Sequence, residues 1–167
     1  MERLERELRR ALDGRVAIIG VGNPVRGDDG FGSIFVRALK GKISYERVLL
    51  IDAETMPENY TRKIRDFKPE KILIIDSTDF GGSPGDLVMF DEESIRGEFM
   101  STHKIPLSAL ASYLKRETTA EVFFLGVQPE RSEIGDKMSK KVAEVMRELL
   151  RLFITLLSQP APSREDP

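Results

Sequence analysis

Four short apolar runs, separated by segments with helical spacing, restrict the possible folds of this chain more than any other feature of its sequence. The runs are VAIIGVG at 16–22, VLLIDA at 48–53, KILIIDS at 71–77 and EVFFLGV at 121–127. Apolar strands that alternate with amphipathic helices form βαβ units, which build a mostly parallel sheet with helices on both faces. With a further edge strand at 86–90, the sequence predicts an α/β three-layer sandwich around a twisted sheet of about five strands.

The helices are predicted from apolar residues that recur every three or four positions. The longest such pattern runs from Met138 to Phe153, and Pro57 is a typical first residue for another helix. The remaining helical segments are 2–13, 31–39 and 107–114. The chain of 167 residues is expected to form one domain over 1–157, followed by a disordered tail, SQPAPSREDP, at 158–167.

Charge and composition exclude several classes of function. The formal net charge is −2 and no long basic or acidic block occurs, so neither nucleic-acid binding nor attachment to a membrane surface is indicated. No apolar run approaches the roughly 18 residues that a membrane-spanning helix needs. Cysteine is absent, which excludes disulfides, thiolate metal ligands and cysteine catalysis. The first ten residues lack the apolar segment of a secretory signal, so we expect a cytoplasmic protein, with its oligomeric state left open.

The first strand leads into a glycine-rich turn, GVGNPVRGDDGFG at 20–32. Such turns often bind phosphate, but Val25 occupies the third glycine position of a dinucleotide motif and Pro24 lacks an amide donor. No Gly-Lys-Ser/Thr follows, and the two adjacent aspartates would repel a phosphate group. The glycines are better explained by a tight turn that exposes side chains and allows another part of the backbone to approach closely.

Acidic side chains follow three of the predicted strands at their carboxyl ends, the edge at which parallel sheets bind ligands. The only histidine, His103, lies just before a predicted helix, where the positive end of the helix dipole favours neutral imidazole. We expect these groups to converge on one edge of the sheet. The polar residues that leave the strands are Asn23, Asp28, Asp29, Asp52, Asp76 and Asp79.

Two kinds of chemistry suit two carboxylates and one imidazole. They can bind a divalent metal such as zinc, nickel, iron or manganese with a position left open for substrate. Alternatively, two neighbouring carboxylates can work as general acid and general base, because each pushes the pKa of the other away from its own. Structural roles stay open as well: Asp28 or Asp29 as a helix N-cap, Asp52 and Asp76 as acceptors for turn amides, and His103 as a solvated side chain.

Four ordered motifs resemble those of the hydrogenase maturation endopeptidases, which process the large subunit of nickel–iron hydrogenases. The first is Gly20-Val-Gly22-Asn23 with Asp28-Asp29-Gly30 and Gly32, and the others are IIDSTD at 74–79, MSTHKIPLSAL at 100–110 and FFLGVQPE at 123–130. The resemblance covers about residues 15–155 and leaves out the N-terminal helix. It is closest to the members that serve formate-hydrogenlyase, the hydrogenase 3 type.

The resemblance implies a function and a set of site residues. Asp29 and Asp76 correspond to the catalytic acids, and together with His103 they correspond to the residues that contact the metal. That metal is expected to be nickel, presented by the large-subunit precursor, whose C-terminal extension the enzyme removes by an aspartic-type or metal-assisted mechanism. The supporting loop comprises Gly22, Asn23, Asp28 and Gly30.

One stretch departs from the family pattern, and two other functions remain open. Where many members have Asp-Gly-Gly-Thr/Ser after the second strand, this chain has Asp52-Ala53-Glu54-Thr55, which lacks the glycines that adopt positive φ readily. The first alternative function is a scaffold that checks the precursor for nickel with little proteolysis of its own. The second is a metallohydrolase for small substrates.

Overall fold

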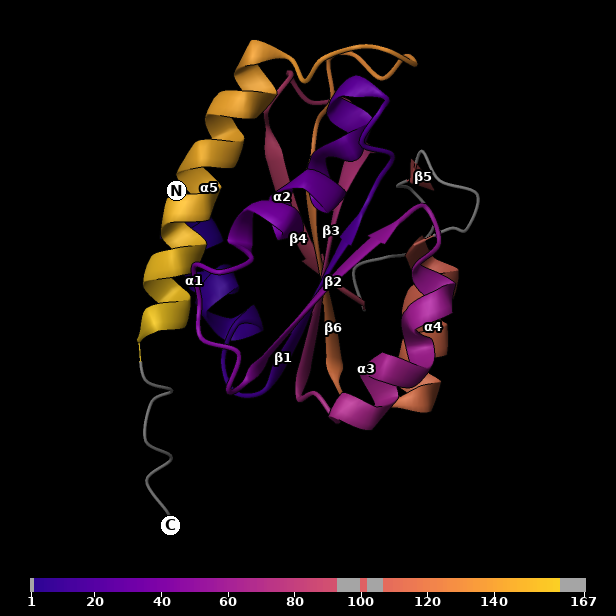
Figure 1. Cartoon of the computed structure of the whole chain (residues 1–167), viewed down its shortest axis with the longest axis vertical. Coiled ribbons are helices and arrows are strands. Elements are labelled where there is room, and N and C mark those ends of the chain that lie inside the picture. Colours follow the sequence, from indigo (N-terminus) through magenta and orange to yellow (C-terminus); the bar gives the residue numbers. More distant parts are fainter. Residues whose placement is uncertain (1, 93–99, 102–106, 160–167) are drawn as a thin grey trace.

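A computed structural model describes residues 2–92, 100–101 and 107–159 and contains a mixed sheet at its centre (Figure 1). The strand order is β2-β1-β3-β6-β4, parallel except for β4, and the short β5 pairs antiparallel with the end of β3. The strands are β1 (Val16–Val21), β2 (Val48–Glu54), β3 (Lys71–Asp79), β4 (Leu87–Asp91), β5 (Met100–Ser101) and β6 (Glu121–Val127). The helices are α1 (Glu2–Ala11), α2 (Phe31–Leu39), α3 (Thr61–Phe67), α4 (Leu107–Glu117) and α5 (Lys140–Ser158), with 3₁₀ turns η1 (Gly27–Gly30) and η2 (Pro57–Tyr60).

Helices cover both faces of the sheet, as the sequence predicts. Figure 1 shows α1, α2 and α5 over one face and α3 and α4 over the other. The first face is filled by a core in which Phe35 of α2 meets Phe153 of α5 edge to face, with ring centroids 4.9 Å apart. The second face buries Ile64 of α3 and Leu114 of α4 against the strands. The three-layer sandwich is therefore confirmed.

The N-terminal helix packs on the body of the protein, as expected for an amphipathic segment. Leu8 and Ala11 are fully buried in the first core. A salt bridge of 2.7 Å joins the Arg10 guanidinium to Glu121 at the start of β6. The Arg47 guanidinium also donates to the backbone oxygens of Leu12 and Gly14, both at 2.8 Å. The C-terminal end of helix α1 is thus held at the amino ends of the central strands.

Some boundaries differ from the sequence expectations. Pro57 begins a 3₁₀ turn, and the α-helix follows only at Thr61. Strand β3 continues to Asp79 because its last residues pair with β5, a strand the sequence pattern did not predict. Helix α5 begins after Met138 and extends through Ser158, one residue into the expected tail, whose last eight residues lie outside the described ranges. No helix of the described residues combines the length and apolar character that a membrane span requires.

Candidate active site

Close backbone contacts place the start of α2 directly on the ends of β1 and β3. A Cβ atom on Gly32 would lie only 2.0 Å from the backbone oxygen of Ile75, and one on Gly20 would lie 2.1 Å from the backbone oxygen of Gly32. Any side chain at these two positions would push the helix away from the sheet. The glycines of the turn therefore allow η1, which carries the two adjacent aspartates, to sit at the carboxyl edge of the sheet.

Two of the predicted site residues, Asp29 and Asp76, are buried in elements that touch each other. Asp29 lies in η1 and is 6% exposed, Asp76 lies in β3 and is 2% exposed, and η1 contacts β3. The Asp76 carboxylate accepts a hydrogen bond of 2.7 Å from the backbone amide of Ser77, and the amide of Asn23 lies 3.4 Å from Asp29 Oδ2. Burying two carboxylates in adjoining elements costs free energy, and this arrangement is typical of functional sites.

The third predicted site residue, His103, lies outside the described residues. Strand β5 ends at Ser101, two positions earlier in the sequence, and pairs with β3 through Thr78 opposite Ser101 and Asp79 opposite Met100. The extension of β3 beyond Asp76 thus binds the start of the histidine segment. Within 2–92, 100–101 and 107–159, no group of three or more His, Asp or Glu side chains is placed to hold a metal. The role of His103 as a metal contact stays a prediction.

The carboxylate of Asp28 has hydrogen-bond partners that differ from those of its neighbour Asp29. Its fully buried carboxylate accepts four hydrogen bonds: from the amides of Glu130 (2.8 Å), Arg131 (3.0 Å) and Ser139 (2.7 Å), and from the Ser139 hydroxyl (2.8 Å). Gly30 occupies the N-cap position of α2, and no side chain caps that helix. The N-cap interpretation of the aspartate pair is therefore wrong, because the Asp28 carboxylate binds the loop after β6.

Asp52 does not join the other acids, contrary to the sequence expectation. Side chains alternate along a strand, so Asp52 points with Leu50 to the face covered by α2, whereas Asp76 points with Ile74 to the opposite face. Asp52 accepts hydrogen bonds from the Ser33 hydroxyl (2.6 Å) and from Nε of Arg37 (2.5 Å). Burial raises the pKa of Asp52, but these bonds and the Arg37 charge outweigh it and hold the pKa below its usual value. Asp52 braces α2 on the sheet.

After β2 this chain has Ala53 and Glu54 where the family pattern has two glycines, and the backbone of Glu54 is affected. This residue adopts φ of +47°, a left-handed conformation that glycine adopts without strain. Its backbone oxygen accepts a hydrogen bond of 2.7 Å from Gly22, and its carboxylate pairs with Arg37 at 2.8 Å. This turn therefore has a positive φ at a non-glycine residue, which its hydrogen bond and ion pair hold in place.

Gln128 has a positioning role that the sequence analysis did not identify. It is largely buried, and its Oε1 accepts hydrogen bonds from the amides of Phe80 (2.9 Å) and Gly82 (3.1 Å). Its Nε2 donates to Asp79 at 3.0 Å, and this bond, followed by one from the Gly81 amide, lowers the pKa of Asp79. Gln128 thereby orders the turn after β3. Gln128 directly follows β6, the last parallel strand. The rule that selected the acids, which is to inspect the residues at the carboxyl ends of the strands, would therefore have identified it as well.

Three comparisons with known proteins agree on the family. The family model described as "Hydrogenase maturation protease" matches residues 35–156. A hydrogenase 3 maturation protease of Escherichia coli strain K12 is 39% identical over 114 residues, 68% of this chain and 72% of that protein. A putative hydrogenase maturation protease of Methanocaldococcus jannaschii is 32% identical over 152 residues, 81% of this chain and 90% of that protein.

A solved structure gives the same result. The [NiFe] hydrogenase maturation protease HycI from Thermococcus kodakarensis KOD1 superposes with a TM-score of 0.84 at 34% identity, over 92% of this chain and 99% of that chain. An open α/β sheet with buried acids at the edge where such sheets bind ligands defines the structural class of this protein. Within that class, the chain belongs to the hydrogenase maturation protease family.

Proposed function

We propose that this protein is an endopeptidase that removes the C-terminal extension of a [NiFe]-hydrogenase large-subunit precursor once nickel has been inserted. Membership of the maturation protease family supports a hydrogenase precursor as the substrate, and the hydrogenase 3 protease among its relatives supports a hydrogenase of that type. The single observation that carries the proposal is the pair of buried acids, Asp29 and Asp76, on touching elements at the carboxyl edge of the sheet. The reaction is proposed to take place in the cytoplasm.

Nickel enters this reaction as part of the substrate. The precursor presents the ion to Asp29, Asp76 and His103, and this contact holds the scissile peptide bond beside the two carboxylates. Holding a bond in reactive geometry is itself a large rate effect, and the ion adds charge stabilisation as a Lewis acid. A precursor without nickel lacks the group that these residues recognise, which explains why cleavage would wait for metal insertion.

One carboxylate of the pair supplies the proton transfers. Both carboxyl groups are ionised while they contact nickel, because a carboxyl group must lose its proton to bind a metal. One of them takes a proton from water as the water oxygen attacks the scissile carbonyl carbon. The same group then gives this proton to the leaving nitrogen as the peptide bond breaks. Activation of the water by the metal is the alternative route.

The test is the intact mass of a large-subunit precursor after incubation with this protein, in nickel-loaded and nickel-free form. Loss of a C-terminal peptide only from the nickel-loaded precursor, and only without the His103→Ala substitution, is the expected result. Binding of the nickel-loaded precursor without any truncation would instead support the scaffold function. Hydrolysis of short peptides or esters in the absence of precursor would favour the metallohydrolase.

A further inference from the structure

Two exposed apolar residues lie in loops that a backbone hydrogen bond joins, close in the chain to the candidate active site. Ile134 is 78% exposed and Val25 is 60% exposed, the two highest values among the large hydrophobic residues that the structure describes. They belong to different loops, but the backbone oxygen of Val25 accepts a hydrogen bond of 2.9 Å from the amide of Gly135. The two positions are therefore adjacent although more than a hundred residues separate them in the sequence.

The backbone holds Ile134 outward at the corner of a tight turn. The amide of Asp136 donates to the oxygen of Glu133 at 3.1 Å, and Gly135 has φ of +90°, so Ile134 takes the first corner position of a type II turn. The Asp136 carboxylate also accepts a bond of 3.1 Å from the Glu133 amide. The corner position of the turn directs the isoleucine away from the body of the protein, in agreement with its exposure.

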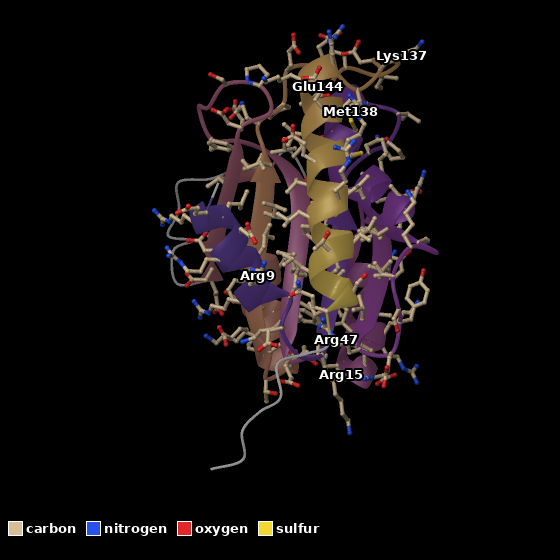
Figure 2. The ribbon with its side chains drawn as sticks, turned by 90° about the vertical axis from the view of Figure 1, so that its left-hand side faces the viewer. Arg9, Arg15, Arg47, Lys137, Met138 and Glu144 are labelled. Carbon is tan, nitrogen blue, oxygen red and sulfur yellow. The ribbon has the colours of Figure 1, made fainter. Side chains whose placement is uncertain are left out.

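The same contacts attach this apolar pair to the loop that carries the aspartates. The amide of Gly27 donates to the backbone oxygen of Asp136 at 3.1 Å, and the amide of Asp28 donates to the backbone oxygen of Arg131 at 2.8 Å. The Arg26 guanidinium donates to the backbone oxygen of Ser132 at 3.1 Å. Figure 2 shows Lys137 and Met138, which follow the turn, at one end of the molecule, and Arg15 and Arg47 toward the other. The pair thus lies at the end of the sheet where Asp29 is, and the charged residues Arg26 and Glu133 are its immediate neighbours in the sequence.

An apolar centre with a charged rim is the usual anatomy of a protein–protein interface. Single exposed apolar residues are common and need no explanation, but here two are brought together and held by backbone hydrogen bonds. Because both are already ordered, a partner that covers them gains apolar burial with little further loss of conformational entropy. The partner must also reach Asp29, four residues beyond Val25, which points to the molecule that is cut.

We infer that Val25 and Ile134 form a preformed docking contact for an apolar surface on the folded large-subunit precursor, beside its C-terminal extension. The inference rests on the proposed function and adds to it the surface by which the enzyme selects its substrate. Val25 and Ile134 are not among the groups that touch the reacting atoms, so they contribute to binding of the precursor and not to the chemical step.

The test compares the Val25→Ser/Ile134→Ser double variant with the unaltered protein on a nickel-loaded precursor that the unaltered protein processes. The serine variant loses the apolar burial that the contact provides, so we expect KM to rise at least about tenfold. The value of kcat and the unfolding temperature should stay within error, and the Val25→Ile/Ile134→Leu variant should restore KM. Tyr45→Ser, a half-exposed residue in the loop between α2 and β2, is the matched control and should leave KM unchanged.

Three outcomes would overturn the inference. An unchanged KM in the double serine variant means that the precursor does not touch this pair, and a loss confined to kcat assigns the pair to the chemical step. The third outcome is that a second copy of this chain covers the pair. Sedimentation velocity would then show a dimer of the unaltered protein and a monomer of the double serine variant, and the second copy would replace the precursor as partner. Failure of the unaltered protein to process any nickel-loaded precursor counts instead against the proposed function, so the two failures are distinguishable.

Discussion

The carboxylate of Asp28 accepts two hydrogen bonds from Ser139, 2.7 Å from its backbone amide and 2.8 Å from its hydroxyl, although the two residues are 111 positions apart in the sequence. Ser139 is the N-cap residue of α5. One buried carboxylate therefore joins the turn after β1 to the start of the longest helix. Its neighbour Asp29 lies at the carboxyl edge of the sheet, so the two adjacent aspartates have separate tasks.

Asp28→Asn is expected to destabilise the fold strongly. All four partners of the Asp28 carboxylate are donors, and an amide group would present its own N–H groups to some of them. Leaving buried donors unpaired costs about 3 kcal/mol or more of unfolding free energy, measured by urea denaturation. Asp66→Asn, at an exposed position, is the control and should change the unfolding free energy by less than about 0.5 kcal/mol. Equal stability of the two variants would contradict the structural role of Asp28.

At Glu54 we expect backbone strain to reverse the usual order of stability between an alanine and a glycine substitution. At an ordinary position, glycine is less stable than alanine by about 0.5–1 kcal/mol because it loses more freedom on folding. At φ of +47°, alanine keeps the strain of the left-handed conformation, about 1–2 kcal/mol, and glycine relieves it. Both substitutions remove the ion pair with Arg37, so their difference isolates the backbone. We expect Glu54→Gly to unfold at higher urea concentration than Glu54→Ala, and the opposite order would show that the turn is unstrained.

Asp52 should make the stability of the protein depend on pH in the acid range. Its pKa is lowered on folding from a usual value of 3.8, so its contribution is fully present above that pH and disappears as the pH falls through the lowered value. Asp52→Asn should therefore cost about 1–2 kcal/mol at pH 7, where it removes charge-assisted bonds from Arg37. The difference between the variant and the unaltered protein should shrink below about pH 4. A difference that is the same at pH 7 and pH 3 would mean that the charge of Asp52 does not contribute.

Most of the fold could be predicted from the sequence because its signals are local. Apolar runs and helical spacing identify β1, β2, β3 and β6 and the faces of α2 and α5, since burial on a sheet or helix imposes a period on the chain. The glycine-rich turn also predicted that another part of the backbone approaches closely, and the contact between Gly32 and Ile75 confirms this prediction. Strand β5 could not be predicted, because its two residues are a strand only through their pairing with the extension of β3.

The candidate site was less accessible to sequence reasoning, for a geometric reason. The strand-end rule selected Asp29 and Asp76, which the structure shows to be buried, but it does not state to which face of the sheet a side chain points. Asp52 points to the face opposite to that of Asp76, and it binds α2 instead of joining the other acids. The partners of Asp28 lie in a loop more than a hundred residues away, and no local pattern reports such a contact.

The rate of C-terminal truncation of a nickel-loaded precursor by the Asp29→Asn and Asp76→Asn variants tests the proposed role of the two buried acids most directly. Both carboxylates are proposed to contact nickel and one of them to transfer the proton, so each substitution should slow truncation, followed by intact mass, by about a hundredfold or more. Urea denaturation should show each variant folded, and Asp76→Asn should still bind the precursor. Truncation by either variant at the rate of the unaltered protein would contradict the assignment of these acids to the active site.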